Sequence, residues 1–407
     1  MLVRRGLFSF LSLGLVCLCA PSHAGILATE LPPVVTTGYR PLEQDERGLW
    51  QSCDELEEMI KVSNLVVRDP EINSYLQGVM YRLLGDQAST MRVYLVRNPE
   101  FNASMAPNGL MMVHTGLLAR VRNEAQLAAV LGHEVGHYAR RHSLQGWRSQ
   151  RAKTSAMAFV AAGANAAGGY TGSRSWYDLA NAINQNLLLS IFSYSRTLES
   201  EADAYGLKLL TKAGYSPEAA SEVWAQLIEE RQASAKARKK KYKDGAASAL
   251  STHPPSQDRM KDLALTAESL KRRTADGVEF DGHRAEFLRA VGPYRAELLD
   301  EQIKLNDSGA SLYLLNSLAQ DGWDSTLKFY EGEMYRFRGE AGDEDRAREA
   351  YLVAAKSPDA SPEAIRAHGY AQLKAGNREE ARRALLQYLE LKPDANDAQM
   401  VRFTLEQ

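Results

Sequence analysis

The segment His133-Glu134-Val135-Gly136-His137 constrains this chain more than any other feature. Its two histidines stand four residues apart, so on a helix they lie on one face, one turn from each other, and both imidazoles can reach one metal ion. Glu134, between them, is placed to hold a water on that metal. Because so short a motif also occurs by chance, the prediction of a metal site depends on a third ligand.

The sequence around this motif is expected to form one helix over residues 124–145. Asn123 and Gln126 are a suitable capping pair at its start, and apolar residues follow at helical spacing. Gly132 and Gly136 weaken an isolated helix. Their presence predicts that another backbone packs closely against this one.

Glu199 is the best candidate for the third protein ligand that a zinc hydrolase needs. It lies in a second predicted helix, residues 195–213, and Asp203 shares its face because it stands four residues further on. Asp203 can accept a hydrogen bond from the outer nitrogen of a ligand histidine and so fix its tautomer. Glu201 lies roughly 160° round the helix from Asp203, which makes it the weaker ligand candidate. The alternative interpretation of this helix is a solvated acidic surface.

The two motifs together resemble the metallopeptidase family of the CAAX prenyl proteases and the HtpX heat-shock protease. The second motif of that family, Glu-x-x-Ala-Asp, is matched by residues 199–203, and the resemblance covers roughly residues 65–270. Features that flank the motifs match as well, namely Asn102-Ala103, Gly116-Leu117-Leu118, Ser195-Arg196, and His253-Pro254 with Arg259. The resemblance implies a zincin-type peptidase domain that binds one Zn²⁺ per chain through His133, His137 and Glu199, with Glu134 as the general base.

The same resemblance draws attention to His253, because the family repeats a His-Pro at this place. Three roles stay open for His253: stabilising the oxyanion of the tetrahedral intermediate, serving as a removable fourth zinc ligand that keeps the enzyme latent, or simply starting a helix. Arg259 is expected either to pair with an acidic residue of the site or to be a helix surface charge. His142, five residues beyond His137 on the same expected helix, falls off the ligand face and is expected to be structural or exposed.

The sequence just before the motif helix predicts a small sheet. Residues 91–96 are rich in β-branched and aromatic side chains and are expected to form a strand, residues 102–107 a loop. A strong Asn-Gly turn signal then precedes the apolar run 110–113. This run is expected to be either an edge strand that pairs with an extended substrate or an ordinary hairpin strand. Helical spacing over residues 46–62 and 70–85 precedes the sheet.

The first 24 residues are typical of a signal peptide, with a charged start, an apolar core over residues 7–20, and a small-x-small cleavage site ending at Ala24. The protein is therefore expected to be exported to the periplasm.

The formal net charge of −2 disfavours a general nucleic-acid binder. Cys53 is the one cysteine of the expected mature chain, so an internal disulfide is not predicted.

Composition and repeat spacing lead to predictions for the segment 146–193 and for the division of the chain into domains. Residues 146–193 contain a run of small residues and a short apolar patch, which indicate either buried helix packing or a lid or membrane-surface element, with peripheral membrane contact as one consequence. Residues 25–275 are expected to form the metallopeptidase domain, and residues 276–407 an all-α, tetratricopeptide-like repeat domain. Small and proline positions of such repeats recur at Gly332, Ala347 and Pro358 and, 37, 34 and 35 residues later, at Gly369, Ala381 and Pro393.

These observations predict an α+β, mostly helical protein with a zincin-type peptidase domain, a small sheet and a helical repeat domain. With the signal peptide, the family resemblance implies a periplasmic zinc endopeptidase that acts on misfolded or misassembled envelope and outer-membrane proteins. The repeats would bind protein partners, such as the machinery that assembles outer-membrane proteins. The alternative is a chaperone or scaffold for outer-membrane assembly, in which the zinc site is latent or structural. A membrane-embedded prenyl-type protease is disfavoured, since no later stretch is apolar enough to span a membrane.

Overall fold

The computed structural model of this chain describes residues 39–149, 152, 194–244, 253, 256–273 and 279–406. The predicted signal peptide and nearly all of the segment 146–193 lie outside the described residues. Among the described helices, none is both long enough and apolar enough to cross a membrane. The described part of the chain is mostly helical and contains one small sheet, as predicted.

The described sheet has three strands in the order β1-β3-β2: β1 (Arg92–Val96), β3 (Leu110–His114) and β2 (Ala103–Met105). β1 runs parallel to β3, and β2 is antiparallel to β3. The expectation that residues 102–107 form a loop was wrong, because they include β2, a strand too short to show alternation. Of the two alternatives for the run 110–113, the structure shows the hairpin strand, which pairs antiparallel with β2 and lies at the centre of the described sheet. The edges of that sheet are β1 and β2.

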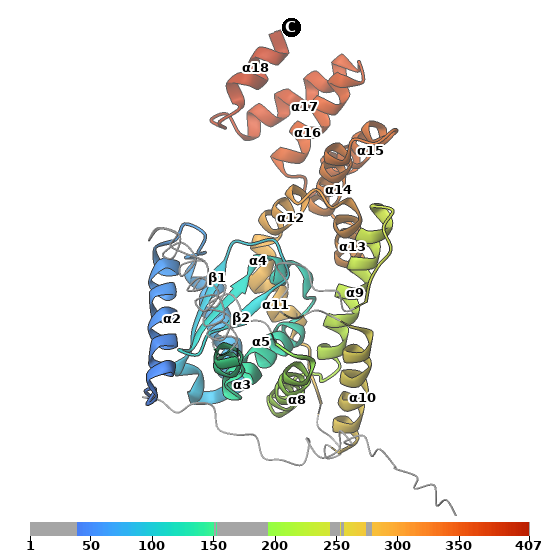
Figure 1. The fold of residues 1–407 in the computed structure, drawn as a ribbon. Coiled ribbons are helices and arrows are strands. Elements are labelled where there is room, and N and C mark those ends of the chain that lie inside the picture. The colour runs from blue at the N-terminus through green and yellow to red at the C-terminus, as the bar shows by residue number, and fades with distance from the viewer. Residues whose placement is uncertain are drawn as a thin grey trace, which may run out of the picture. The chain divides into compact units, whose positions relative to one another are not determined.

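The helices that precede the site pack on this sheet. α3 contacts β1 and α5 contacts β2, while α2 lies beside the sheet (Figure 1). α2 buries Leu49 and Cys53 in a cluster with Ala106 and Leu110. The elements of this part are α2 (Gln44–Val62), α3 (Pro70–Leu84), the 3₁₀ helix η1 (Gly85–Thr90), α4 (Thr115–Arg120) and α5 (Glu124–Ala139).

α5 carries the His-Glu-Val-Gly-His segment and begins as predicted, because the Asn123 side chain accepts a hydrogen bond from the Gln126 N–H. Its end differs from the prediction. The helix stops at Ala139, Arg141 has a φ of 55°, and helix resumes over residues 142–149. A left-handed residue cannot continue a right-handed helix, so the chain changes direction there.

α8 (Arg196–Lys212) carries the second motif, and α9 (Ala219–Ala237) and α10 (Gln257–Arg273) follow it. The Ser195 side chain accepts a hydrogen bond from the Leu198 N–H and caps α8. Gly214, with a φ of 83°, lies just beyond the end of α8. α8 lies alongside α5, which brings the two motifs together.

The helices after residue 279 begin by packing on the elements already described. α11 contacts α3 and α5, α12 contacts α4, and α13 contacts α9. Arg97 pairs with Glu297, and Arg120 donates a hydrogen bond to Gln302. These elements are α11 (Arg284–Val291), η2 (Gly292–Tyr294), α12 (Arg295–Lys304), α13 (Ser308–Leu318) and η3 (Ala319–Asp321).

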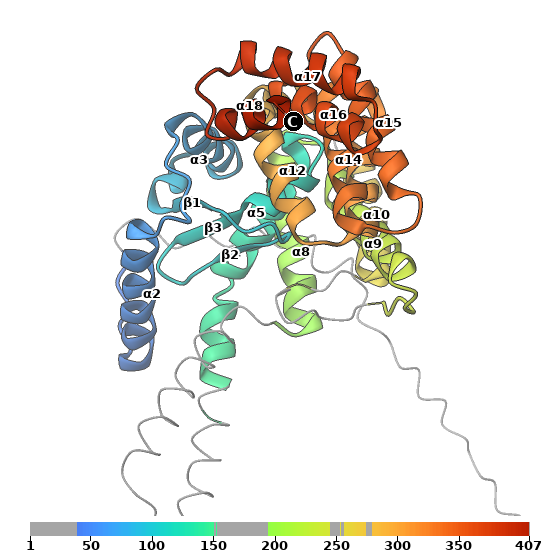
Figure 2. The same cartoon turned by 90° about the horizontal axis from the view of Figure 1, so that it is seen from above.

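The last five helices each contact the next along the chain, as Figure 2 shows in orange and red. Gly332 of α14 lies against the ring of Tyr351 in α15, and Gly369 of α16 lies against Leu385 in α17. The two helix pairs thus use a glycine at the same place for close packing. The helices are α14 (Ser325–Arg338), α15 (Asp343–Lys356), α16 (Pro362–Lys374), α17 (Arg378–Leu391) and α18 (Ala398–Glu406). Their assignment as tetratricopeptide repeats stays a prediction.

Candidate metal centre

Close packing of α5 on α8 positions the site. A Cβ added at Gly136 would stand 2.9 Å from the backbone of Ala202, and one added at Gly206 would stand 2.7 Å from the His133 nitrogen. Real side-chain carbons do not fit at such distances, so glycine is required where the two backbones meet. The close approach predicted from Gly132 and Gly136 is confirmed, and it carries Glu199 to the histidines.

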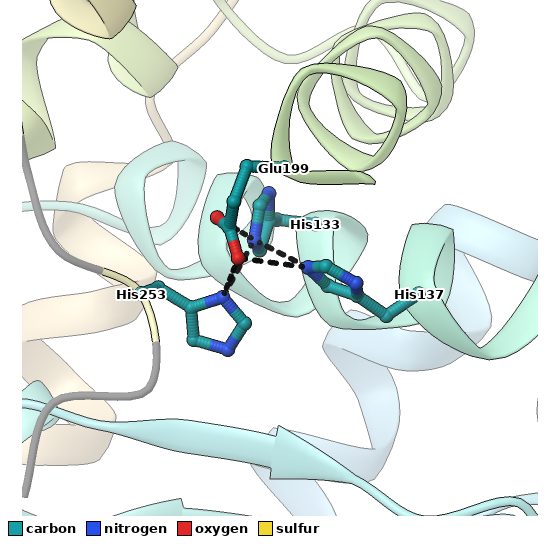
Figure 3. Close-up of side chains that lie close together, drawn as sticks. All are labelled: His133, His137, Glu199 and His253. Carbon is teal, nitrogen blue, oxygen red and sulfur yellow. Dashed lines mark hydrogen bonds and ion pairs between the residues drawn. The ribbon is translucent and has the colours of Figure 1, made fainter. Parts of the chain in front are cut away.

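Four buried side chains converge at this crossing, and Figure 3 shows them pointing toward one another from α5, α8 and the segment at residue 253. The ligand atoms offered by His133, His137, Glu199 and His253 all lie within 4.8 Å of one another. His133 Nε2 is 3.0 Å from His137 Nε2 and 3.5 Å from Glu199 Oε2. His137 Nε2 is 3.7 Å from Glu199 Oε1.

These distances suit a single tetrahedral metal ion. Ligands that each stand about 2.0–2.1 Å from a zinc ion, at tetrahedral angles, are separated from one another by about 3.3 Å. Two imidazole nitrogens and a carboxylate oxygen, all buried here, are also one of the donor sets that catalytic zinc sites use. The residues present therefore fit one zinc ion, and the predicted ligands His133, His137 and Glu199 lie together.

His253 brings a fourth donor into the same cluster. Its Nδ1 lies 2.8 Å from Glu199 Oε1 and 3.3 Å from His133 Nε2. On the other side of the ring, Nε2 lies 3.3 Å from Glu134 Oε1. The second carboxylate oxygen of Glu134 is buried and has no hydrogen-bond partner among the described residues. Glu134 thus faces the cluster with one oxygen available to accept a proton.

The ion pair of Asp203 and Arg259 lies on the side of His133 that faces away from the cluster. Asp203 Oδ1 lies 2.9 Å from His133 Nδ1, the nitrogen that points away from the cluster. Arg259 pairs with Asp203 at 2.8 Å and with Glu199 at 2.9 Å, and its guanidinium lies over the ring of Trp224. Of the two roles considered for Arg259, the structure shows the pairing with site acids. No sequence pattern singled out Trp224, which lies more than 80 residues from His133 and His137 in the chain.

Different groups surround His137. Its Nδ1 lies 2.9 Å from His142 Nδ1, and the ring of Tyr194 stacks on it with 3.7 Å between ring centroids. His142 is buried and lies behind His137, outside the group of donors. The expectation that it continues the helix of His137 was wrong, because Arg141 ends that helix and redirects the chain. Tyr194 was not predicted to be a site residue either. Its position directly before Ser195-Arg196, which flanks the second motif, could have indicated it.

The electrostatics of the protein groups alone suit cation binding. Burial lowers the pKa of an imidazole, but the carboxylates of Asp203 and Glu199 raise the pKa of His133 to about 10. Burial and the nearby imidazoles of His133 and His253 lower the pKa of His137 well below its usual value. Burial opposes ionisation of Glu199, yet the neighbouring histidines hold its pKa far below the usual range. An incoming cation would meet a carboxylate and a neutral imidazole, and would displace a proton from His133.

A cavity of about 230 Å³ opens beside these residues. The edge of the sheet forms one wall through Phe101, Asn102 and Ala103, and His133 and Glu134 line the cavity as well. The other walls come from α9 and from the α12–α13 region, through Trp224, Leu227, Gln302, Leu305 and Ala310. The cavity therefore joins the cluster to a sheet edge and to helices that follow residue 279.

Comparisons with known proteins agree with this geometry. The profile of peptidase family M48 matches residues 67–267. The chain is 26% identical over 256 residues to a putative beta-barrel assembly-enhancing protease of Vibrio cholerae, covering 61% of this chain and 50% of that protein. It is 33% identical over 209 residues to the mitochondrial metalloendopeptidase OMA1 of Schizosaccharomyces pombe, covering 50% and 56%. It is 24% identical over 297 residues to the beta-barrel assembly-enhancing protease of Escherichia coli, covering 70% and 58%. The chain thus spans half to three fifths of the length of these relatives.

Proposed function

Because residues 67–267 belong to peptidase family M48, as the two sequence motifs predicted, we propose that this chain is a zinc-dependent endopeptidase with one Zn²⁺ per chain. Members of this family are zinc metallopeptidases. The observation that carries the proposal is the convergence of His133, His137 and Glu199, with the buried carboxylate of Glu134 beside them.

The residues divide the chemistry of peptide hydrolysis among them. His133, His137 and Glu199 would hold the zinc ion, which when bound supplies a Lewis acid that polarises the scissile carbonyl and lowers the pKa of a water. Glu134 takes the proton of the attacking water and passes it to the leaving amine. Burial raises the pKa of Glu134, which suits a group that must hold a proton between these two steps. Asp203 keeps His133 in the tautomer whose Nε2 can bind a cation.

The cavity and the sheet edge suit an extended peptide. Backbone groups of a substrate can add to the edge at β2, whose first residue, Ala103, lines the cavity beside the site. The apolar side chains of Phe101, Leu227 and Leu305 then offer room for a large apolar residue next to the scissile bond. This arrangement supports cleavage within a chain, as an endopeptidase requires.

His253 is best placed as a removable fourth ligand, the second of the three roles left open by the sequence. Its Nδ1 is part of the donor cluster, at 2.8 Å from Glu199 Oε1 and 3.3 Å from His133 Nε2. A catalytic zinc site keeps one position open for water or substrate. We therefore propose that the described state is latent, and that His253 must move away before cleavage.

Substrates, location and partners rest on the relatives and on composition. Two of the relatives carry names that place them in beta-barrel assembly. By analogy, this protein would be periplasmic and would degrade misfolded or misassembled envelope and outer-membrane proteins. The helix pairs α14–α15 and α16–α17 would act as tetratricopeptide-like repeats that bind the outer-membrane assembly machinery. A hollow of about 900 Å³ among α14, α15, α16 and α18 offers a surface for such a partner.

A second function is favoured by one observation, the presence of four protein donors in the cluster. Four protein ligands are typical of structural rather than catalytic zinc sites. The protein would then act as a chaperone or scaffold for outer-membrane assembly, and its helix pairs would bind the partner proteins. The two functions coexist if His253 releases the zinc ion when a client binds.

The deciding experiment uses the full exported chain and its Glu134→Gln variant, which keeps the three predicted ligands. Zinc content is measured by elemental analysis and cleavage by casein digestion. One zinc per chain with cleavage that depends on Glu134 supports the endopeptidase. Equal cleavage by both proteins at a rate above background contradicts it, whereas background rates in both are expected if His253 keeps the wild type latent. Rescue of a deletion strain by the Glu134→Gln variant would instead support the chaperone.

A further inference from the structure

The two histidines of the His-Glu-x-x-His segment have different partners on the side that faces away from the cluster. His133 Nδ1 faces the carboxylate of Asp203 at 2.9 Å. His137 Nδ1 faces another imidazole, His142 Nδ1, also at 2.9 Å. The far nitrogen of His142, Nε2, lies 3.4 Å from Glu201 Oε2. A series of contacts therefore runs outward from His137 through His142 to Glu201, whose side chain is one-third exposed.

The position of each proton along this series of contacts follows from the chemistry of imidazole. If His137 offers the lone pair of Nε2 to a metal ion, its proton sits on Nδ1. That N–H points at His142 Nδ1, which must then accept and carry no proton. The proton of a neutral His142 consequently sits on Nε2, where Glu201 is the acceptor. The hydrogen bond from His137 to His142 thus fixes the tautomer of His142, and this tautomer donates from Nε2 to Glu201.

We propose that His142 and Glu201 are positioning residues for zinc binding, which fix the tautomer and the ring orientation of His137. This inference rests on the zinc site of the proposed function and adds two residues to it. Outer partners of this kind raise the basicity of a ligand histidine and hold its ring in place. Glu201, which is the weaker candidate for a direct ligand, acquires a role through His142.

The local fold explains why this pair forms. On a regular helix, a residue five positions after His137 would lie about 140° round the axis from it. The left-handed turn at Arg141 ends that helix and returns His142 to His137. Across the α5–α8 contact, Glu201 leaves α8 on a different side from Asp203, so each ligand histidine has its own acidic partner. Arg140 lies 3.4 Å from Glu201 Oε2 and adds a positive charge to its outer side.

The test compares zinc affinity, measured by competition with a chromophoric chelator, in the full chain and its variants. His142→Ala removes the acceptor, and we expect zinc affinity to fall about 10- to 100-fold. His142→Asn places a carbonyl oxygen near the position of the imidazole Nδ1, so it should restore affinity to within about threefold of wild type. Glu201→Ala should weaken zinc binding by about 3- to 10-fold, because its bond is longer and its effect is indirect.

Thermal unfolding of each protein after zinc removal separates positioning from folding. A positioning role predicts that His142→Asn and Glu201→Ala unfold at the wild-type temperature without zinc, while Glu201→Ala still binds zinc more weakly. If His142→Ala fails to fold, the comparison of Glu201→Ala with wild type decides. Wild-type affinity in both His142→Ala and Glu201→Ala overturns the inference. Failure of the wild type itself to bind zinc overturns the proposed function instead, so the two failures are distinguishable.

Discussion

His253 Nδ1 lies 2.8 Å from Glu199 Oε1, although 54 residues separate them in the chain. This contact places a fourth buried nitrogen among the donors of the candidate zinc site. A hydrolytic site needs one position for water and substrate. The proposed peptidase activity would therefore depend on whether His253 stays at this position.

Replacing His253 with alanine should activate the protein. Three protein donors remain for zinc, and the position that His253 fills becomes accessible, so casein cleavage should rise by at least about tenfold, equivalent to roughly 1.4 kcal/mol. Zinc content should stay at one per chain. A fall in cleavage with zinc retained would indicate instead that His253 stabilises the oxyanion.

Replacing Glu199 with alanine should weaken zinc binding, because only the three imidazoles of the cluster remain as donors. The variant loses the one carboxylate ligand, so zinc affinity should fall by more than the roughly 10- to 100-fold cost of altering an outer partner. Chelator competition measures this loss. Ser200→Ala is the matched control, because Ser200 is the next residue of α8 and is exposed. Equal zinc affinity in Glu199→Ala and Ser200→Ala would exclude Glu199 as a ligand.

Replacing Gly136 with alanine should separate α5 from α8. The new methyl would stand 2.9 Å from backbone atoms of Ala202, so overpacking should lower the free energy of unfolding by about 1–3 kcal/mol. Gly78→Ala in α3 is the control, since a Cβ there has no atom within 4 Å. That control should raise stability by about 0.5–1 kcal/mol. Denaturant unfolding of both variants checks the prediction, and equal effects would contradict it.

Acid should weaken the helical region through Asp343. The Arg338 guanidinium lowers the pKa of this buried carboxyl to about 2, against an ordinary value near 3.8. A depressed pKa contributes stability that is fully present above pH 4 and is lost as the pH falls toward 2. Asp343→Asn should therefore lower the free energy of unfolding by about 1–2 kcal/mol at pH 7, and the difference should shrink below pH 4.

Thermal unfolding of wild type and variant across this pH range measures the effect. Asp345→Asn is the control, because Asp345 is a largely exposed member of a surface pair. A pH-independent difference for Asp343→Asn would contradict the assigned pKa.

The sequence predicted the parts of the site that depend on short-range spacing. Residues 133–137 and 199–203 each lie on one helix, so helical geometry alone predicts which side chains share a face. The glycines at 132 and 136 also predicted that another backbone packs closely against this helix, and the structure shows that this backbone is that of α8. The start of α5 followed from the Asn123 cap.

The rest depended on contacts that spacing does not encode. The turn at Arg141 carries no glycine or proline to signal it, so the place of His142 next to His137 was missed. The strand β2 has three residues, too few for a periodic pattern. Trp224 supports Arg259 from α9, and only the packing of α9 on α10 brings the two together.

The proposed role of Glu134 as the general base of a zinc endopeptidase has a direct test. The most direct measurement is casein cleavage by zinc-loaded His253→Ala and by His253→Ala/Glu134→Gln, with zinc content determined for both. Loss of a general base typically costs about 10²- to 10⁴-fold in rate. We predict one zinc per chain in both proteins and cleavage that the second substitution abolishes. Equal cleavage by the two proteins would contradict it.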